Sequence, residues 1–329
     1  MTSKEQIFIG IDISKHKLDL CIHQEGKKDV FCELKNEPNA IKKFFTRYNS
    51  EVVLVGVENT GRYNYPLNFV FRKLNTKLFI IPPLQLKASL GIARGKSDKI
   101  DSKRIVEYLR KNIDDLQQWR PASMDLERIK LLLAERQQKT KLIRQLSPNM
   151  KELEMIQDVG ISEMMDKHCK AVIAVLKEQI KEIEKSINSI IINNTELREI
   201  SKYITSVPGV GKVLCWMLLV KTNAFQSFSS ARKLACFAGV VPFDYSSGTS
   251  VHRRSRVSYL SDKTLKTVLH LAALRAVRMP NDLQIYYEKK VKEGKNKMSV
   301  LNAVRNKIVH RVFSVVKNKK MYEKNLIMS

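Results

Sequence analysis

The sequence lacks the long apolar segment of a membrane protein and the cysteine pattern of a disulfide-stabilised or zinc-binding one. Its longest apolar runs, such as Val213–Val220, are far shorter than the ~20 residues of a membrane-spanning helix. The five cysteines are scattered and form no Cys-x-x-Cys pair, which is typical of reduced thiols in the cytosol. The first residues lead into a strand-like segment without the layout of a signal peptide. We therefore expect a cytoplasmic protein that has no membrane partner.

Acidic residues are scarce relative to basic ones. The 329-residue chain has 59 Lys and Arg against 33 Asp and Glu, a formal net charge of +26. Such an excess is self-repelling unless a polyanion neutralises it, and the usual polyanion is nucleic acid. Lysines and arginines that recur through 289–320 favour phosphate contacts with a strong salt dependence. A ribosomal or histone-like binder would explain the charge, but it would not explain the motifs below.

The order of expected elements indicates an α/β domain at the N-terminus. Residues 7–34 are strand-like, 38–48 fit a helix, and 52–57 form an apolar run typical of a strand buried on both faces. A helix, a strand at 77–81 and another helix follow. Three strands followed by alternating helices and strands predict a mixed central sheet.

The character of the sequence changes near residue 121. Apolar residues in 167–192, beyond a break expected near Pro148, step alternately by three and four, as in a coiled coil or long helical hairpin that could join subunits. One amphipathic helix packed on its own domain is the alternative. The later section reads as mainly helical, with a Gly/Ser-rich loop at 240–250. We predict three parts: an α/β domain at 1–120, a helical arm at 121–196 and a mainly helical domain at 197–329.

Four acidic residues occupy positions that suit a metal site. Asp12 ends the first apolar strand, and Glu58 ends the buried one. Asp98 and Asp101 are three apart at the start of a helix and share one side of it. Carboxylates at strand ends open into the crevice where α/β sheets place their sites, and their oxygens suit hard divalent cations. Each acid alone could be a cap or an ion-pair partner; in this order they match the layout of the ribonuclease H-like superfamily.

Two glycine-containing motifs of the last section could contact phosphate. PGVGK (208–212) lies between helices, and N–H groups at such a helix start can bind an anion, as in a helix-hairpin-helix turn. A plain glycine turn between packed helices is the alternative. The stretch 245–248, YSSG, precedes several arginines that could stabilise charge during attack of a serine on phosphorus, although a Ser-Gly loop by itself is weak evidence of a site. The predicted nucleic-acid contacts are Lys212, Arg253, Arg254 and Arg256.

All of these motifs, in this order, resemble the DEDD transposases of the insertion-sequence family that also includes the Piv DNA invertases and bridge-RNA-guided recombinases. GIDISK with Asp12, VENTGRY with Glu58, and KSDKIDS with Asp98 and Asp101 are similar to the family's RuvC-like quartet. SVPGVGK, FAGVVP and YSSG are similar to its C-terminal transposase domain. The resemblance covers nearly the whole chain.

The resemblance implies a RuvC-like domain joined through a coiled coil to a C-terminal domain. The acid quartet would bind Mg²⁺. Ser247, directly before the glycine of the Tyr-x-Ser-Gly stretch, would be the nucleophile that forms a phosphoserine link to the cut DNA strand; Ser246 is its neighbour and the alternative. Strand exchange would pass through a four-way junction, with the site shared between subunits of a dimer or tetramer. In RNA-guided members a bridge RNA pairs with target and donor DNA.

Two positions depart from the family pattern. Ser102 follows the last acid, where the family usually has a small residue such as Ala. Residues 258–261 read SYLS, where the family's basic helix usually begins Ser-Lys-x-Gly, so that helix's contacts do not carry over to this chain.

We predict a Mg²⁺-dependent DNA transposase that mobilises its own insertion sequence, with a bridge RNA as guide, and that associates with the nucleoid of a prokaryotic cell. The alternatives are a Piv-type invertase and a non-catalytic nucleic-acid-binding descendant of a transposase. Such a descendant should have lost at least one acid. A RuvC-like junction resolvase would not need the C-terminal serine domain.

Overall fold

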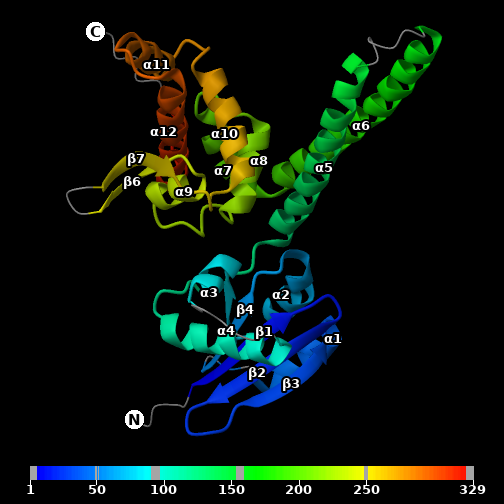
Figure 1. Ribbon diagram of the computed structural model, residues 1–329, viewed down its shortest axis with the longest axis vertical. Coiled ribbons are helices and arrows are strands. Elements are labelled where there is room, and N and C mark those ends of the chain that lie inside the picture. Colours follow the sequence, from blue (N-terminus) through cyan, green and yellow to red (C-terminus); the bar gives the residue numbers. More distant parts are fainter. Residues whose placement is uncertain are drawn as a thin grey trace. The chain divides into compact units, whose positions relative to one another are not determined.

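The computed structural model describes residues 6–48, 50, 52–89, 97–152, 159–247 and 251–323 (Figure 1). The chain divides into two compact units, 1–121 and 122–329. Within the described ranges, no helix combines the length and apolar composition that crossing a bilayer requires.

The N-terminal unit is built on a mixed five-stranded sheet in the order β3-β2-β1-β4-β5. Strands β1, β2 and β3 pair antiparallel, whereas β1 with β4 and β4 with β5 pair parallel. The predicted α/β plan with a mixed sheet is confirmed. The elements are β1 (Ile7–Ile13), β2 (Lys17–Gln24), β3 (Val30–Lys35), α1 (Pro38–Phe45), β4 (Val53–Glu58), α2 (Tyr65–Phe71), β5 (Lys77–Ile81), α3 (Pro83–Ser89) and α4 (Asp98–Asn112).

Different helices cover the two faces of this sheet. On one face, Ile9 and Ile11 of β1 and Val55 and Val57 of β4 form a core with apolar residues of α1 and α2. On the other face, α4 packs against β1, β2 and β4, and it crosses the front of the sheet in Figure 1. Because side chains alternate along a strand, the even-numbered residues of β1 and β4 face α4.

Two glycines let α4 lie directly on the sheet. Gly10 of β1 and Gly56 of β4 are paired neighbours on the α4 face. A Cβ at position 10 would collide with the backbone carbonyl oxygen of Ser102 and lie 2.8 Å from a Val106 methyl, and one at position 56 would lie 3.1 Å from a methyl of Ile105. Ser102 is fully buried at this contact. The small residue after the last predicted acid is therefore a packing requirement.

In the C-terminal unit, two long helices form an arm. Helices α5 (Met124–Glu152) and α6 (Val159–Asn193) lie side by side (Figure 1), and Arg136 of α5 forms an ion pair with Glu184 of α6 at 2.8 Å. The break expected near Pro148 is wrong, because α5 continues through that residue. A proline removes one hydrogen bond from a helix interior, a loss that this long helix absorbs without ending.

The rest of this unit is mainly helical, as predicted. Every residue of α8 from Leu214 to Leu219 is buried, so α8 forms the centre of the unit's core. The elements are α7 (Thr195–Ser206), α8 (Lys212–Lys221), α9 (Ala231–Phe237), β6 (Pro242–Ser247), β7 (Val251–Val257), α10 (Lys263–Ala276), α11 (Asp282–Lys292) and α12 (Lys297–Asn318).

Much of the stretch expected to be a Gly/Ser-rich loop forms the first strand of a β-ribbon instead. Strands β6 and β7 pair antiparallel and project from the helices of the unit (Figure 1). The Gly- and Ser-rich composition of 240–250 indicated a loop, but Val251–Val257 supplies a partner strand with which Pro242–Ser247 pairs.

We predict that Gly10→Val destabilises the N-terminal unit by about 2 kcal/mol or more, because the carbonyl of Ser102 belongs to a helix backbone that cannot move aside alone. Chemical denaturation of the full chain, followed by circular dichroism, measures the loss. Ser102→Ala is the matched control, since it keeps a small side chain at the same contact and should cost less than about 1 kcal/mol. Equal stability of Gly10→Val and the unmodified chain would contradict the close packing.

Candidate functional site

The sheet register places two of the predicted acids side by side. Asp12 is the penultimate residue of β1 and Glu58 the last residue of β4. The parallel pairing runs through Ile11 with Val57, so the next residues of each strand are neighbours. Both acids lie two residues after the glycines that face α4, and both are half-buried on that face.

Helix α4 brings the other two predicted acids to the same end of the sheet. Asp98 is its first residue, and the hydroxyl of Ser97 caps the helix by accepting a hydrogen bond from the Ile100 N–H at 3.3 Å. Burial, and then the negative charges of Asp101, Asp98, Glu58 and Asp19 in that order, raise the pKa of Asp12 to about 6. The charges of the other three predicted acids therefore reach Asp12, although the four come from three elements.

The loop after β4 is fixed by a buried asparagine that the sequence analysis did not identify. The side-chain oxygen of Asn64, which is 2% exposed, accepts hydrogen bonds from the backbone N–H and the hydroxyl of Thr60 at 2.9 and 2.7 Å. Its amide nitrogen donates to the backbone carbonyl of Glu58 at 3.2 Å. Asn64 therefore holds the backbone at Glu58 in place.

Acidic residues continue across the sheet beyond the predicted four. Asp12 pairs with Asp19 of β2, and Asp19 pairs with Glu33 of β3. With Glu58 on the other side of Asp12, carboxylates occupy one row across four strands. Neither Asp19 nor Glu33 was singled out from the sequence, because a cross-strand row becomes visible only when the register is known.

One lysine neutralises part of this row. The ammonium of Lys17, at the start of β2, lies 2.8 Å from a carboxylate oxygen of Asp98, 3.1 Å from Asp19 and 3.3 Å from Glu33. The pKa of Lys17 is raised, first by its hydrogen bond to Asp98 and then by the one to Asp19. Lys17 is therefore a counter-ion shared by one predicted acid and two acids that the sequence analysis missed.

Both predicted acids of α4 have basic partners. Asp98 is bonded to Lys17, and Asp101 forms an ion pair with Arg104 at 2.9 Å. For the carboxylates of Asp12 and Glu58, the described part of the chain provides no ion pair. Nor do its residues place three His, Cys, Asp or Glu side chains in an arrangement that could hold a metal ion directly. A metal at this end of the sheet would require Asp98 and Asp101 to turn away from Lys17 and Arg104.

The predicted serine lies at the outer end of the β-ribbon. Ser247 is the last residue of β6 and pairs with Val251, while Ser246 pairs with His252 and Tyr245 with Arg253. For Ser246, Ser247, Arg253, Arg254 and Arg256 the structure describes the backbone within the strands, and their side chains lie outside the described part. Residues 248–250 lie outside it entirely.

The PGVGK turn serves packing through its first glycine. Gly209 has a φ of +83°, and a Cβ there would collide with the carbonyl oxygen of Ala272 on α10 and lie 2.7 Å from the Cβ of Ala276. The predicted alternative, a glycine turn between packed helices, explains this residue. Gly211, in contrast, faces open space as the N-cap of α8, and Lys212 is exposed beside it.

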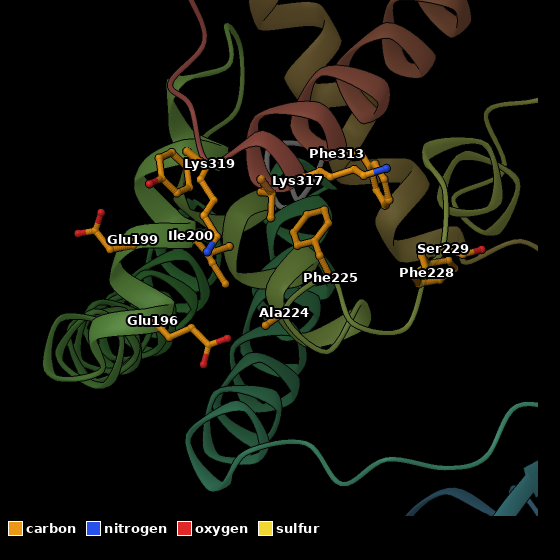
Figure 2. Close-up of a pocket in the computed structure, with 12 residues that line it drawn as sticks. Glu196, Glu199, Ile200, Ala224, Phe225, Phe228, Ser229, Phe313, Lys317 and Lys319 are labelled. Carbon is orange, nitrogen blue, oxygen red and sulfur yellow. The ribbon is translucent and has the colours of Figure 1, made fainter.

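A separate apolar pocket of about 570 Å³ lies between α7 and α12 (Figure 2). Aromatic rings form much of its wall, among them Phe225 and Phe313, whose centroids are 6.1 Å apart. Glu196 and Glu199 of α7 and Lys317 of α12 add charge to the lining. None of the predicted site residues lines this pocket.

Two family models match the chain. One is the model of the DEDD transposases of IS110, described as "Transposase". It matches residues 9–153, which include all four predicted acids. The other, "Transposase IS116/IS110/IS902 family", matches 201–288, which include Ser247. The chain belongs to the IS110 family of transposases. The family resemblance inferred from the motifs is thus confirmed, and with it a DNA-binding, DNA-modifying enzyme.

The proteins similar in sequence include two gene-inverting proteins and one protein of an insertion element. The "Pilin gene-inverting protein" of Moraxella bovis is 26% identical over 332 residues, covering 97% of this chain and 98% of that protein. Its counterpart in Moraxella lacunata is 27% identical over 331 residues, with the same coverage. The "Insertion element IS110 uncharacterized 43.6 kDa protein" of Streptomyces coelicolor is 27% identical over 154 residues, 47% of this chain and 37% of that one.

Two solved structures also match this IS110-family transposase. Thermus thermophilus RuvC is 15% identical and covers 35% of this chain and 100% of its own, with a TM-score of 0.28. T. thermophilus RuvC in complex with a Holliday junction substrate is 12% identical and covers 35% of this chain and 99% of its own, with a TM-score of 0.25.

Because the pKa of Asp12 is raised, replacing its carboxylate by a neutral amide should stabilise the protein by an amount that depends on pH. The folded protein retains the Asp12 proton up to about pH 6, whereas the unfolded chain loses it near pH 4, so ionisation of Asp12 lowers stability as the pH rises between these values. In buffer without divalent cations, Asp12→Asn should raise the free energy of unfolding at about pH 7.5 by about 1–2 kcal/mol, after allowance for solvent screening, and by almost nothing near pH 4.

Urea denaturation across this pH range measures the difference between the two proteins. The exposed Asp115→Asn is the matched control, which should differ from the unmodified chain by the same small amount at every pH. If the difference in the free energy of unfolding between Asp12→Asn and the unmodified chain stayed constant with pH, the pKa of Asp12 would not be raised in the folded protein.

Proposed function

We propose that this transposase is a Mg²⁺-dependent recombinase that moves its own insertion sequence, with Asp12, Glu58, Asp98 and Asp101 as its metal-binding acids. The observation that carries the proposal is that Asp12 and Glu58 lie at the ends of neighbouring parallel strands, close enough to Asp98 and Asp101 of α4 for all three other charges to raise the pKa of Asp12. Like charges are brought together at a cost in stability. A cluster of this kind at the carboxyl ends of parallel strands is where α/β proteins place their sites.

The donor set suits a hard divalent cation such as Mg²⁺, because it consists of carboxylate oxygens. Asp12 and Glu58 would hold the ion from the sheet, and Asp98 and Asp101 from α4. When bound, such an ion supplies charge stabilisation for the oxygens of a phosphate undergoing displacement. Asn64 keeps the backbone at Glu58 fixed. Asp98 and Asp101 would give up their ion pairs with Lys17 and Arg104 to reach the ion.

Ser247 is the proposed nucleophile. Its hydroxyl oxygen would form a bond to phosphorus while the bond from that phosphorus to one sugar oxygen breaks, leaving a phosphoserine link and a free strand end with a hydroxyl group. Arg253, Arg254 and Arg256 on the partner strand would stabilise the charge that develops on the phosphate. The end position of Ser247 on a projecting ribbon supports access to a DNA strand.

A bridge RNA and a second subunit are further parts of the proposal. The net charge of +26 is larger than a few DNA contacts need, which supports an additional nucleic-acid partner, with Lys212 among the contacts. For assembly, α6 exposes Val172 and Val175, at 50% and 58%, on the arm that the sequence predicted as an oligomer contact. A dimer or tetramer could cover these side chains.

A Piv-type invertase is the second candidate, and one observation favours it. The pilin gene-inverting proteins match 97% of the chain, whereas the IS110 element protein matches 47%. The two activities share their chemistry and differ in their DNA products. Sequencing the junctions formed in cells that express the protein distinguishes an inverted segment from an excised and reinserted element.

We predict that Asp12→Asn and Asp98→Asn each reduce strand exchange by about a hundredfold or more, because each removes a carboxylate from the proposed metal site. DNA binding, measured by electrophoretic mobility shift, should change little. Asp115→Asn, which removes an exposed acid of the same unit, should recombine normally. Recombination by both variants at the rate of the unmodified chain would refute the metal-site assignment, whereas a complete lack of recombination by the unmodified chain would favour the non-catalytic descendant.

For the nucleophile, Ser247→Ala should eliminate the covalent protein–DNA adduct seen on a denaturing gel with a nicked or suicide substrate, since alanine has no oxygen to attack phosphorus. Ser246→Ala is the matched control on the adjacent residue and should retain the adduct. The opposite pattern, in which the adduct is lost from Ser246→Ala alone, would transfer the role to Ser246.

A further inference from the structure

The C-terminal unit has an open cavity of about 790 Å³ at the base of the β-ribbon. The start of β6 and the end of β7 form one side of it, through Pro242 and Val257, and helices α10 and α12 form the rest. The basic side chains that line it are Lys266 of α10 and Arg305 of α12. No acidic residue of the described chain is part of the lining.

Arg305 is buried and has no acidic counter-ion among the residues that the structure describes. It is only 7% exposed, and its Nε atom has no hydrogen-bond partner among the described residues. Burial lowers the pKa of its guanidinium. A buried charge without a partner is costly and is normally paired or bound to a ligand. Arg305 therefore lacks the anion that a buried arginine requires.

Two more basic groups lie near this guanidinium. Lys266 and His270 are one turn apart on α10, and the pKa of each is lowered, first by burial and then by the positive charge of Arg305. The Nδ1 atom of His270 is also buried without a partner. The charge of Arg305 thus acts on two other basic side chains, no acid of the described residues lines the cavity, and an anion placed there would relieve the repulsion.

We propose that this cavity binds a phosphate of the DNA backbone, held by the guanidinium of Arg305 and the ammonium of Lys266. The hydroxyl of Ser299, which also lines the cavity, is a further donor. Arginine matches a phosphate with two parallel N–H donors, and lysine adds a point charge. The cavity would fix the position of the strand and would not read its sequence.

The choice of DNA rests on the proposed role of Ser247. Val251, the partner of Ser247, and Val257 at the cavity are six residue steps apart along β7, a length of about 20 Å at the usual strand rise. Successive phosphates of B-form DNA advance about 3.4 Å along the axis. A strand that follows the ribbon with one phosphate at Ser247 would therefore bring another phosphate to the cavity about six nucleotides away.

The test measures binding without any cleavage step, so its outcome is independent of whether the acids and Ser247 act as proposed. A fluorescein-labelled DNA duplex of arbitrary sequence is titrated with the full chain at several salt concentrations, with fluorescence anisotropy as the readout. Each lost phosphate contact lowers the slope of log K against log [salt] by about one. Lys266→Gln should show this change and bind about tenfold more weakly at low salt.

Arg305→Met should have at least the same effect, and Arg305→Lys should restore part of the slope because it keeps the charge. Since Arg305 is buried, the thermal midpoint of each variant is measured with and without inorganic phosphate. Phosphate should raise the midpoint of the unmodified chain more than that of Lys266→Gln. Lys202→Gln, which removes an exposed lysine of α7 paired with Glu199, is the matched control and should keep the slope.

An unchanged slope in Lys266→Gln, or the same loss in Lys202→Gln, would overturn the proposal. If Lys266→Gln lowered the salt slope for an RNA duplex of the same sequence but left the slope for the DNA duplex unchanged, the choice of DNA would be overturned.

Discussion

Helix α4 can carry two acids to the end of the sheet because Gly10 and Gly56 have no side chains to hold it away. The backbone of α4 then lies against β1, with Ser102 fully buried at the contact. This approach sets the height of Asp98 and Asp101 above the sheet, on the face where Asp12 and Glu58 project. The position of Asp98 and Asp101 depends on this contact, and the small side chain of Ser102 after the last acid fits the same steric limit.

Much of the N-terminal unit could be predicted because its strands carry simple hydrophobic patterns. A buried apolar run that ends in Glu58 already placed a carboxylate at a strand end, and the spacing of Asp98 and Asp101 placed both on one side of a helix. Asp19, Glu33 and the bridging position of Lys17 could not be predicted, because they depend on cross-strand register. The β-ribbon was missed for another reason: its composition near 240–250 favours loops, and only pairing with a second strand stabilises it.

The two units contain charge clusters of opposite sign. In the N-terminal unit, acids gather in a row across four strands within a chain whose net charge is +26. In the C-terminal unit, Lys266, His270 and Arg305 gather without an acid. Each cluster lowers the stability of its own unit, and each would be relieved by an ion of opposite sign, a metal cation in one and a phosphate in the other. A nucleic acid with bound Mg²⁺ would supply both the cation and the phosphate.

The Lys17 ammonium is a counter-ion within the chain for the acids Asp19, Glu33 and Asp98. If the proposed ion binds, the Lys17 ammonium would compete with it for the oxygens of Asp98. Such competition would weaken retention of the ion, so its occupancy would follow the free concentration of the ion in the cell and would not be fixed once at synthesis.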